Sequence, residues 1–196
     1  MKTINDDQVK ERLKGIRLLV LDVDGVLTDG TIRLSQSGEE TKVFHVRDGY
    51  GLKLLMDNGV EVAIISGRAS SVVETRAAEL GIREVYQGVK RKEAVCRELL
   101  DKRGLREQEV ASVGDDLPDR ALFACSGVCI AVADAAEELL EAADAITDKK
   151  GGDGAVREIC EWILKSQGKW IDAIGKGLGN GKSYGGAGKT SEARTK

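Results

Sequence analysis

Histidine is almost absent from this 196-residue chain, and its scarcity excludes several kinds of catalytic site. With His45 as the single histidine, the sequence can build neither an HExxH zinc site nor any metal site that needs several imidazoles. A serine–histidine triad would have to use His45, and no nucleophile elbow surrounds that residue. If the chain is an enzyme, its acid–base chemistry therefore falls to carboxylates or lysine.

Long apolar runs are also missing. No stretch approaches the roughly 18 apolar residues that a membrane span needs, and residues 1–15 lack the apolar h-region of a signal peptide. We therefore expect a cytoplasmic protein with no membrane partner. The four cysteines show no CxxC spacing, which is typical of buried reduced thiols. Aromatic residues make up only 4% and are not interleaved with basic ones, so no nucleic-acid partner is expected.

Glycine and charge are unevenly distributed along the chain. Residues 167–196 are rich in glycine and lysine, and such a stretch cannot bury enough apolar surface to order itself. We expect it to form a flexible tail. Residues 1–166 hold the acidic excess and the apolar runs, and they are expected to form one compact domain.

Within residues 1–166, short apolar runs alternate with helical patterns. This β-α-β-α order predicts an α/β, Rossmann-like fold in which a parallel sheet is covered by helices on both faces. Residues 31–35 and 41–46 flank a polar turn and are expected to form a β-hairpin, which spans 31–46. The expected strands are 17–23, 61–66, 84–87, 109–114, 128–132 and 145–147, and the expected helices are 48–58, 69–80, 90–102, 118–125, 135–142 and 153–167.

Three polar clusters follow three of these strands at the point where each strand ends. In an open α/β sheet, the carboxyl ends of the strands meet at one edge and form the ligand crevice, so clusters far apart in sequence can converge there. A lone Asp-Gly after a strand is usually only a turn, but three clusters at one edge favour a functional site. The clusters are DVDGVLTDG at 22–30, Ser66-Gly67-Arg68, and GDDLPD at 114–119.

The carboxylates in two of these clusters predict a metal site. Two carboxylates 4 Å apart repel by roughly 4 kcal/mol at an effective dielectric constant near 20. Asp22, Asp24 and Asp115 would therefore either raise their pKa values or bind a cation. A hard divalent ion with few protein ligands is typically Mg²⁺, which can neutralise a phosphate and orient it against a nucleophile. Ser66 and the amides that start the next helix would supply donors to that phosphate.

In their order and spacing, the three motifs resemble those of the haloacid dehalogenase (HAD) superfamily of phosphotransferases. More narrowly, FHVRDGYG at 44–51, YQG at 86–88 and GGDGAVRE at 151–158 resemble the capless phosphatases of this superfamily that act on 3-deoxy-D-manno-octulosonate 8-phosphate. The resemblance runs from about residue 16 to residue 168. It implies the HAD variant of the Rossmann-like fold, with the hairpin in place of a cap domain.

The resemblance also implies a role for each polar residue. Asp22 would be the nucleophile that forms an aspartyl-phosphate, and Asp24 the general acid and base. Lys92 would steady both nucleophile and phosphate, with Lys90 as its competitor for that role. Asp22, Asp115 and the backbone carbonyl of Asp24 would bind Mg²⁺. Ser66 and the Gly67 amide would bind the phosphate. Asp116 and Asp119 would hold the groups that bind the metal.

Substrate choice and assembly are likewise implied by the resemblance. Arg68 and Arg76, near the start of one helix, are expected to form a cationic patch that suits the carboxylate of an octulosonate. Arg157 is a third candidate for substrate binding, although its helix also suits a structural role. Without a cap, the site would be covered by a neighbouring chain, and hairpins would join the chains into a homotetramer. The implied activity is a Mg²⁺-dependent sugar-phosphate monoesterase in lipopolysaccharide sugar synthesis.

Three other functions remain open at this point. A phosphatase for nine-carbon, sialic-acid-type sugar 9-phosphates would share the chemistry and would be expected to carry an acidic residue in place of Arg68. A non-catalytic interaction or regulatory module with this fold would be expected to have lost Asp22 or Asp24, and both are present. A phosphomutase would keep these aspartates but would usually carry a cap domain.

Overall fold

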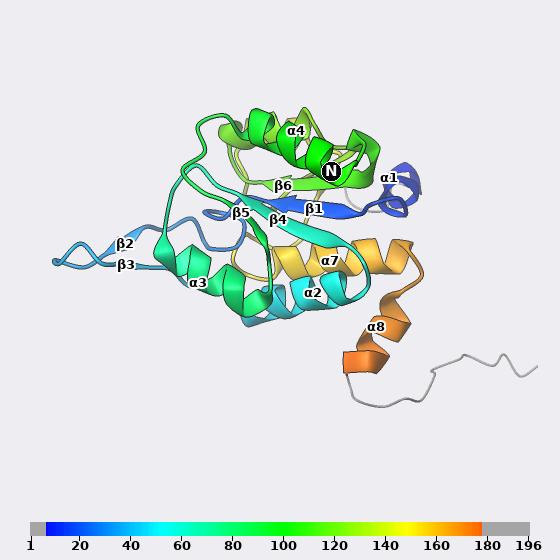
Figure 1. Ribbon diagram of the computed structural model, residues 1–196, viewed down its shortest axis with the longest axis horizontal. Coiled ribbons are helices and arrows are strands. Elements are labelled where there is room, and N and C mark those ends of the chain that lie inside the picture. The colour runs from blue at the N-terminus through cyan, green and yellow to red at the C-terminus, as the bar shows by residue number, and fades with distance from the viewer. Residues whose placement is uncertain (1–6, 178–196) are drawn as a thin grey trace, which may run out of the picture.

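Six parallel strands form the central sheet of the protein, whose computed structural model describes residues 7–177 (Figure 1). The strands lie in the order β5-β4-β1-β6-β7-β8. From β1 the chain first builds the side that holds β4 and β5, and then crosses β1 to build β6, β7 and β8. The strands are β1 Leu18–Leu21, β4 Glu61–Ile65, β5 Glu84–Tyr86, β6 Val110–Gly114, β7 Val128–Ala131 and β8 Ala145–Ile146.

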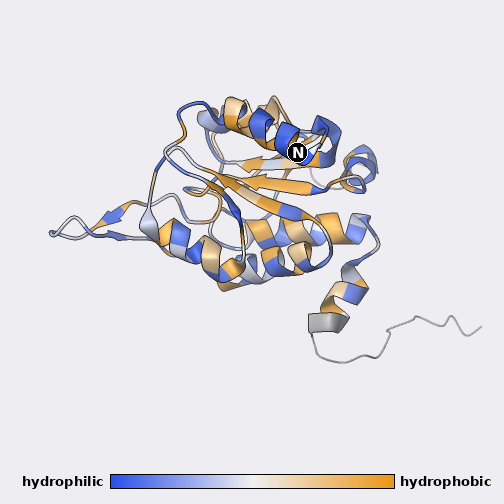
Figure 2. Cartoon of the chain, in the orientation of Figure 1, coloured by the Kyte–Doolittle hydropathy of each residue, from blue (hydrophilic) through white to orange (hydrophobic). Residues whose placement is uncertain are grey.

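Helices cover both faces of this sheet, as the β-α-β-α pattern predicts. Leu19 and Leu21 of β1 belong to the larger apolar cluster, whereas Leu18 and Val20 point into the smaller cluster on the opposite face. Burial on both faces explains why the strands are continuous apolar runs (Figure 2). The larger cluster includes side chains of α1 Asp7–Leu13, α2 Val46–Asp57, α3 Ser71–Leu80, α6 Glu137–Ala142 and α7 Ala155–Ser166, and the smaller cluster includes those of α4 Lys92–Arg103 and α5 Arg120–Phe123.

The topology fixes where a site can form. Because β1 lies between β4 and β6 and all three strands are parallel, the loops that follow them leave the sheet at the same edge. The chain also reverses its direction of travel across the sheet at β1, which makes this edge a switch point of the topology. Short 3₁₀ turns at Glu107–Glu109 and Leu117–Asp119 precede and follow β6. No helix among residues 7–177 is long and apolar enough to cross a membrane.

The hairpin is shorter than expected. Its ladder is confined to β2 Arg33–Leu34 and β3 Glu40–Thr41, whereas strands over 31–35 and 41–46 were expected. The hairpin projects from the body, and an isolated pair of strands is only marginally stable in water, so little beyond the turn supports a longer ladder (Figure 1). Val46 belongs instead to α2, whose first turn is closed by a bond from the Gly49 amide to the His45 carbonyl.

The tail expected from residue 167 onward begins with a helix instead, α8 Trp170–Gly177. Ala173 is fully buried and Trp170 packs against the larger cluster. The Lys169 ammonium donates a hydrogen bond to the carbonyl of Asn58 at the end of α2. The prediction of a tail rested on the average glycine content of residues 167–196. That average does not reveal the short apolar face of α8, which packs against α2 and α7. The rest of the predicted tail, 178–196, lies outside the described residues.

Candidate active site

A crevice of roughly 270 Å³ opens at the carboxyl edge of the sheet. It is bordered by the loops that follow β1, β4 and β6 and by the start of α4. Every predicted site residue except Arg76 and Arg157 lines it. The lining residues are Asp22, Asp24, Ser66, Gly67, Arg68, Lys92, Asp115, Asp116, Pro118 and Asp119. The three motifs, which are far apart in the sequence, thus meet in one cavity.

A buried ion-pair network lies at the bottom of the crevice. The Lys92 ammonium donates to Asp22 Oδ1 and to Asp119 Oδ1, each at 2.7 Å. All three side chains are buried. Burial alone would lower the pKa of Lys92, but the two carboxylates raise it above its ordinary value. Of the two competing lysines, Lys92 is therefore the one that contacts Asp22, whereas Lys90 is exposed.

Next to this network the site is rich in negative charge. One carboxylate oxygen from each of Asp22, Asp115 and Asp119 lies within 4.8 Å of the others. Burial first, and then repulsion by Asp119, raises the pKa of Asp22 to about 6. Burial, followed by repulsion from Asp119 and Asp22, raises the pKa of Asp115 to about 8. Lys92 does not offset the charge of three carboxylates, so the donor set fits a bound divalent cation.

The members of this carboxylate group are not equivalent. Asp119 Oδ1 accepts from Lys92, and its Oδ2 accepts from the amides of Asp115 and Asp116 at 3.0 and 3.4 Å. With three donors in place, Asp119 is suited to hold its neighbours rather than to bind a metal directly. Asp116 is exposed, and its Oδ1 accepts from the Leu117 amide at the start of the 3₁₀ turn. Asp22 and Asp115 therefore offer the freer carboxylate oxygens.

The loop after β1 can approach Asp115 because of glycine. Gly25 has a left-handed backbone conformation (φ = 97°), and a Cβ at this position would collide with the Asp115 carboxylate. Thr28 holds the loop together, since its hydroxyl accepts from the amides of Gly25 and Gly30. Gly151 packs so closely on the Gly25 carbonyl that it also has no room for a Cβ. The GGDG motif at 151–154 therefore supports the DVDG loop from behind.

Asp24 lies in a different charge environment from Asp22. The Lys42 ammonium bonds to Asp24 Oδ1, and Arg68 Nε lies 3.4 Å from Asp24 Oδ2. Glu40 accepts from Arg68 Nη2 at 2.8 Å and lies 3.4 Å from Lys42. Sequence reasoning missed Lys42 and Glu40, because charged residues beside a hairpin turn are typical of a solvated surface. No signal in a single sequence distinguishes them from ordinary surface charges.

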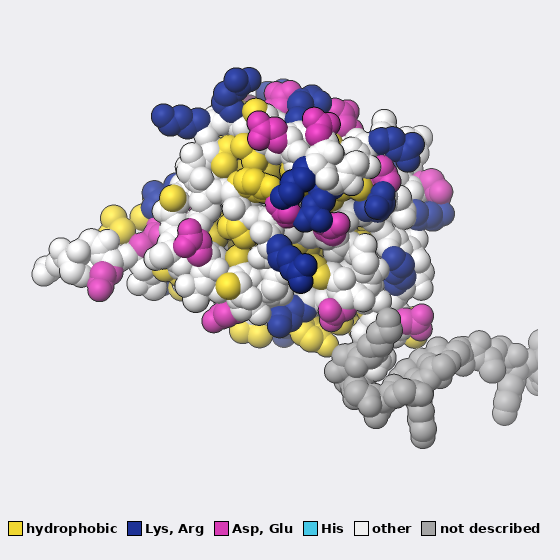
Figure 3. Space-filling model, viewed as in Figure 1, with side chains coloured by type: hydrophobic (Ala, Val, Ile, Leu, Met, Phe, Trp, Pro, Cys, Tyr) yellow, Lys and Arg dark blue, Asp and Glu magenta, His cyan; other side chains and the backbone are white. Residues whose placement is uncertain are grey.

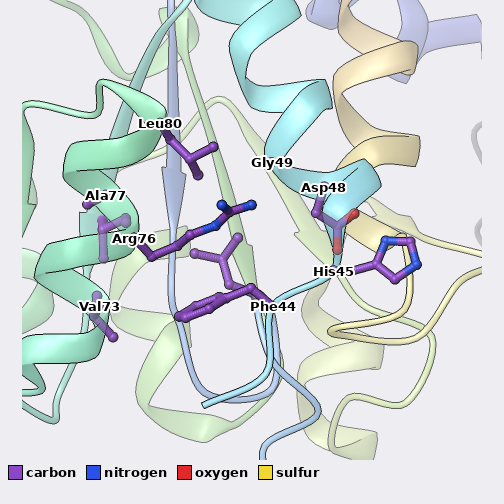
Figure 4. A pocket seen from close by; sticks show the side chains of 10 residues that line it. Phe44, His45, Asp48, Gly49, Val73, Arg76, Ala77 and Leu80 are labelled. Carbon is purple, nitrogen blue, oxygen red and sulfur yellow. The ribbon is translucent and has the colours of Figure 1, made fainter. Parts of the chain in front are cut away.

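Arg76 does not join Arg68 in the crevice. It lines an apolar pocket beside α2, where its guanidinium carbon lies 6.0 Å from the centroid of the Phe44 ring (Figure 4). A Cβ on Gly49 would collide with this guanidinium, so that glycine gives Arg76 its space. Nη1 also contacts Glu79 at 3.1 Å. Within one chain, the two arginines therefore line different cavities instead of the single patch that was expected.

Arg157 occupies a packing position on α7. Its guanidinium lies over the rings of Tyr50 and Trp170, at 5.6 and 5.3 Å, and its Nε bonds to Glu161 at 2.9 Å. The Arg157 amide donates to Asp48 Oδ1 at 2.7 Å, which ties the first turn of α7 to α2. These contacts join α2, α7 and α8 away from the crevice. Within one chain they correspond to the structural role rather than to substrate binding.

Comparison with known proteins identifies the family. Residues 81–159 match the model of the haloacid dehalogenase-like hydrolases. The 3-deoxy-D-manno-octulosonate 8-phosphate phosphatase KdsC of Escherichia coli (strain K12) is 47% identical over 167 residues, which cover 85% of this chain and 89% of that protein. The chain belongs to this family of phosphatases. KdsC of Yersinia pestis is also 47% identical, over 86% of this chain and 90% of its own. The resemblance inferred from the motifs is confirmed.

Solved structures of the phosphatase family agree with the fold. A Yersinia pestis 3-deoxy-D-manno-octulosonate 8-phosphate phosphatase superposes with a TM-score of 0.82 at 47% identity, over 84% of this chain and 89% of that one. The Moraxella catarrhalis enzyme, in complex with a magnesium ion, a phosphate ion and KDO, gives a TM-score of 0.85 at 41% identity, over 88% and 99% of the two chains. The predicted HAD fold is confirmed, and magnesium agrees with the donor set described above.

Proposed function

We propose that this chain is a Mg²⁺-dependent phosphatase that hydrolyses 3-deoxy-D-manno-octulosonate 8-phosphate to the free sugar acid and phosphate. The observation that carries the proposal is the convergence of the Asp22 and Asp115 carboxylates beside the Lys92 ammonium in an open crevice. The family membership supports the choice of substrate, and the Moraxella relative binds magnesium, phosphate and KDO. Such an enzyme belongs to lipopolysaccharide sugar synthesis. The cysteines of the chain are free thiols, which fits a cytoplasmic location.

Asp22, Asp115 and the backbone carbonyl of Asp24 would hold Mg²⁺. When bound, this ion supplies the positive charge that the carboxylate group lacks and neutralises part of the charge of the phosphate. Asp119 would keep Asp115 in place through its bonds to the backbone of the loop after β6. Asp116, which lines the same crevice, would belong to the outer support of the site.

The reaction would proceed in two displacements at phosphorus. Asp22 attacks the phosphoryl group, forming a carboxylate O–P bond, and the bond from phosphorus to the sugar oxygen breaks. Asp24 gives its proton to that departing oxygen, then removes a proton from the water that attacks the aspartyl-phosphate and releases phosphate. Lys92, the Ser66 hydroxyl and the Gly67 amide would hold the phosphoryl oxygens. Ser66 is buried at the crevice wall, where a fixed donor needs no reorganisation during the reaction.

Phosphate release from a panel of sugar phosphates tests this proposal. The panel contains the eight-carbon octulosonate 8-phosphate, a nine-carbon sialic-acid-type 9-phosphate and a neutral hexose phosphate. We expect the octulosonate ester to give the highest kcat/KM, activity to disappear with a chelator, and Mg²⁺ to restore it. A higher kcat/KM for the nine-carbon ester would make that ester the substrate in place of the octulosonate. Hydrolysis that resists the chelator would contradict the role of the metal.

Arg68 is the residue that should distinguish acidic from neutral sugars in this panel. A change to glutamate would place a third carboxylate beside Asp24 and Glu40, so Arg68→Gln is the cleaner variant. It should raise KM for the octulosonate ester about tenfold, because a charge-assisted bond to the substrate carboxylate is lost. The neutral hexose phosphate should change little. Equal losses on both substrates would contradict a role for Arg68 in carboxylate recognition.

We also propose that the hairpin joins chains into a homotetramer whose neighbouring subunits cover each crevice. Apolar side chains are exposed on the projecting hairpin (Figure 3), and others are exposed at its junction with α2. Ile32, Leu34, Val43 and Val46 are between 49% and 79% exposed, which is costly for a lone chain in water. Light scattering at assay concentration should give four times the mass of one chain. A monomeric mass with full activity would contradict the shared site.

A further inference from the structure

The hairpin and its junction with the body reverse the usual distribution of side chains. Leu34 is 64% exposed and Val43 is 54% exposed, while the side chain of Lys42, next to Val43, is only 2% exposed. Removing an ammonium group from water costs free energy unless ion pairs replace the lost hydration. A lysine whose side chain is buried between the exposed residues Thr41 and Val43 therefore indicates a specific partner.

That partner is the proposed general acid and base. The Lys42 ammonium bonds to Asp24 Oδ1 and lies 3.4 Å from Glu40 Oε1. Arg68 completes a ring of alternating charges, with Nε 3.4 Å from Asp24 Oδ2 and Nη2 2.8 Å from Glu40 Oε1. The ring joins the loop after β1, the loop after β4 and the segment around β3. The hairpin segment thus contacts the site of its own chain.

This ring has a consequence for the orientation of Asp24. Asp24 follows Asp22 by two residues on one loop, so its carboxylate could turn toward the same cation. Instead it lies outside the group formed by Asp22, Asp115 and Asp119. The two cations bind the Asp24 carboxylate on the side of β3 and of the loop after β4. An acid or base must keep its oxygen near the reacting proton rather than on a metal.

The two cations are not equivalent in this respect. Arg68 lines the crevice, where an anionic substrate can compete for its guanidinium, whereas Lys42 is not among the lining residues and its side chain is almost fully buried. Lys42 is therefore the contact that can hold Asp24 both before and after substrate enters. It occupies one carboxylate oxygen and leaves the other, Oδ2, on the Arg68 side, which faces the crevice.

We propose that Lys42 is a positioning residue that holds Asp24 in the orientation needed for proton transfer. The inference rests on the proposed role of Asp24. It makes the segment around β3 part of the catalytic apparatus of its own chain, separate from any contact with a neighbouring chain. Correct folding of the hairpin would then be needed for proton transfer at the site.

The test compares two leaving groups on one enzyme sample. The sugar oxygen of octulosonate 8-phosphate must be protonated as it leaves, whereas the phenolate of 4-nitrophenyl phosphate departs without a proton. Lys42→Met should lower kcat/KM for the sugar phosphate about tenfold or more, and leave kcat/KM for the aryl phosphate within about twofold. Because both values come from one sample, their ratio does not depend on the fraction of folded enzyme. If Lys42→Met yields no folded protein, Lys42→Gln gives the same ratio.

Three further variants make the outcome decisive. Asp24→Asn should lower the same ratio, and Lys42→Met added to Asp24→Asn should lower it no further, because the lysine then has nothing to position. Arg33→Met, which removes a hairpin cation whose ion pair is with the exposed Asp29, should leave the ratio unchanged. An equal loss on both substrates, or an additive loss in the double variant, would overturn the inference. An unchanged ratio in Asp24→Asn itself would instead overturn the role proposed for Asp24.

Discussion

Asp22→Asn is expected to lower turnover by about 10⁴-fold or more while the protein stays folded, because the change removes the carboxylate oxygen proposed to accept the phosphoryl group. Asparagine keeps the shape of the side chain but removes the nucleophilic oxygen. The buried carboxylate has a pKa raised to about 6, so the fold disfavours its ionised form. Loss of activity should therefore not come from loss of structure.

Melting curves separate these two effects. Since folded Asp22 binds its proton more tightly than the unfolded residue, its contribution to stability falls as pH rises from about 4 to about 6. Asp22→Asn lacks this contribution. Without metal, the variant should melt no lower than the wild type at pH 8. At pH 5 the melting temperature of the wild type should rise relative to that of the variant. Asp29→Asn, the same change at an exposed position of the same loop, is the control. Substantial residual turnover in Asp22→Asn would contradict covalent catalysis.

The sheet and most of the site could be predicted because strong signals coincide there. The strands after which Asp22, Ser66 and Asp115 follow are buried on both faces, so apolar continuity marks each strand and the first polar residue marks its end. Parallel pairing then places these residues at one edge without any knowledge of their contacts. The observed bounds of the helices differ from the predicted bounds by only a few residues. Residues that end a helix, such as Gly81 after α3, can be recognised in the sequence.

The parts that were missed depend on contacts that a single sequence does not reveal. Lys42 has the same residue type as any solvated lysine, and its burial follows only from where the segment after β3 meets Asp24. The helix α8 is stabilised because its apolar face packs against α2 and α7, and the local sequence does not reveal that these helices lie beside it. The sequence does not distinguish a substrate-binding role of Arg157 from a packing role, because the aromatic rings that surround it come from two other helices, α2 and α8. In each case tertiary packing decided what local pattern could not.

Lys92→Met should remove both activity and the charge balance of the site. The Lys92 ammonium is the buried cation between Asp22 and Asp119, at 2.7 Å from each. Its loss leaves the carboxylates facing one another in a buried space, and breaking a buried pair of this kind costs about 3–5 kcal/mol. At pH 8 without metal, the variant should therefore melt well below the wild type. Turnover should fall by about 10³-fold, because the phosphoryl oxygens lose their fixed cation.

The same charge argument predicts how the stability of Lys92→Met can be recovered. Mg²⁺ supplies positive charge to the remaining carboxylates, and acid protonates them, so either treatment should raise the melting temperature of the variant more than that of the wild type. The sign follows from Asp115, whose pKa is already raised to about 8: folded carboxylates with raised pKa values lose stability as pH rises. Lys90→Met, two residues earlier and exposed, should change neither property. If Lys90→Met lost activity and Lys92→Met did not, the lysine of the site would be the other one, and the buried network would serve the fold alone.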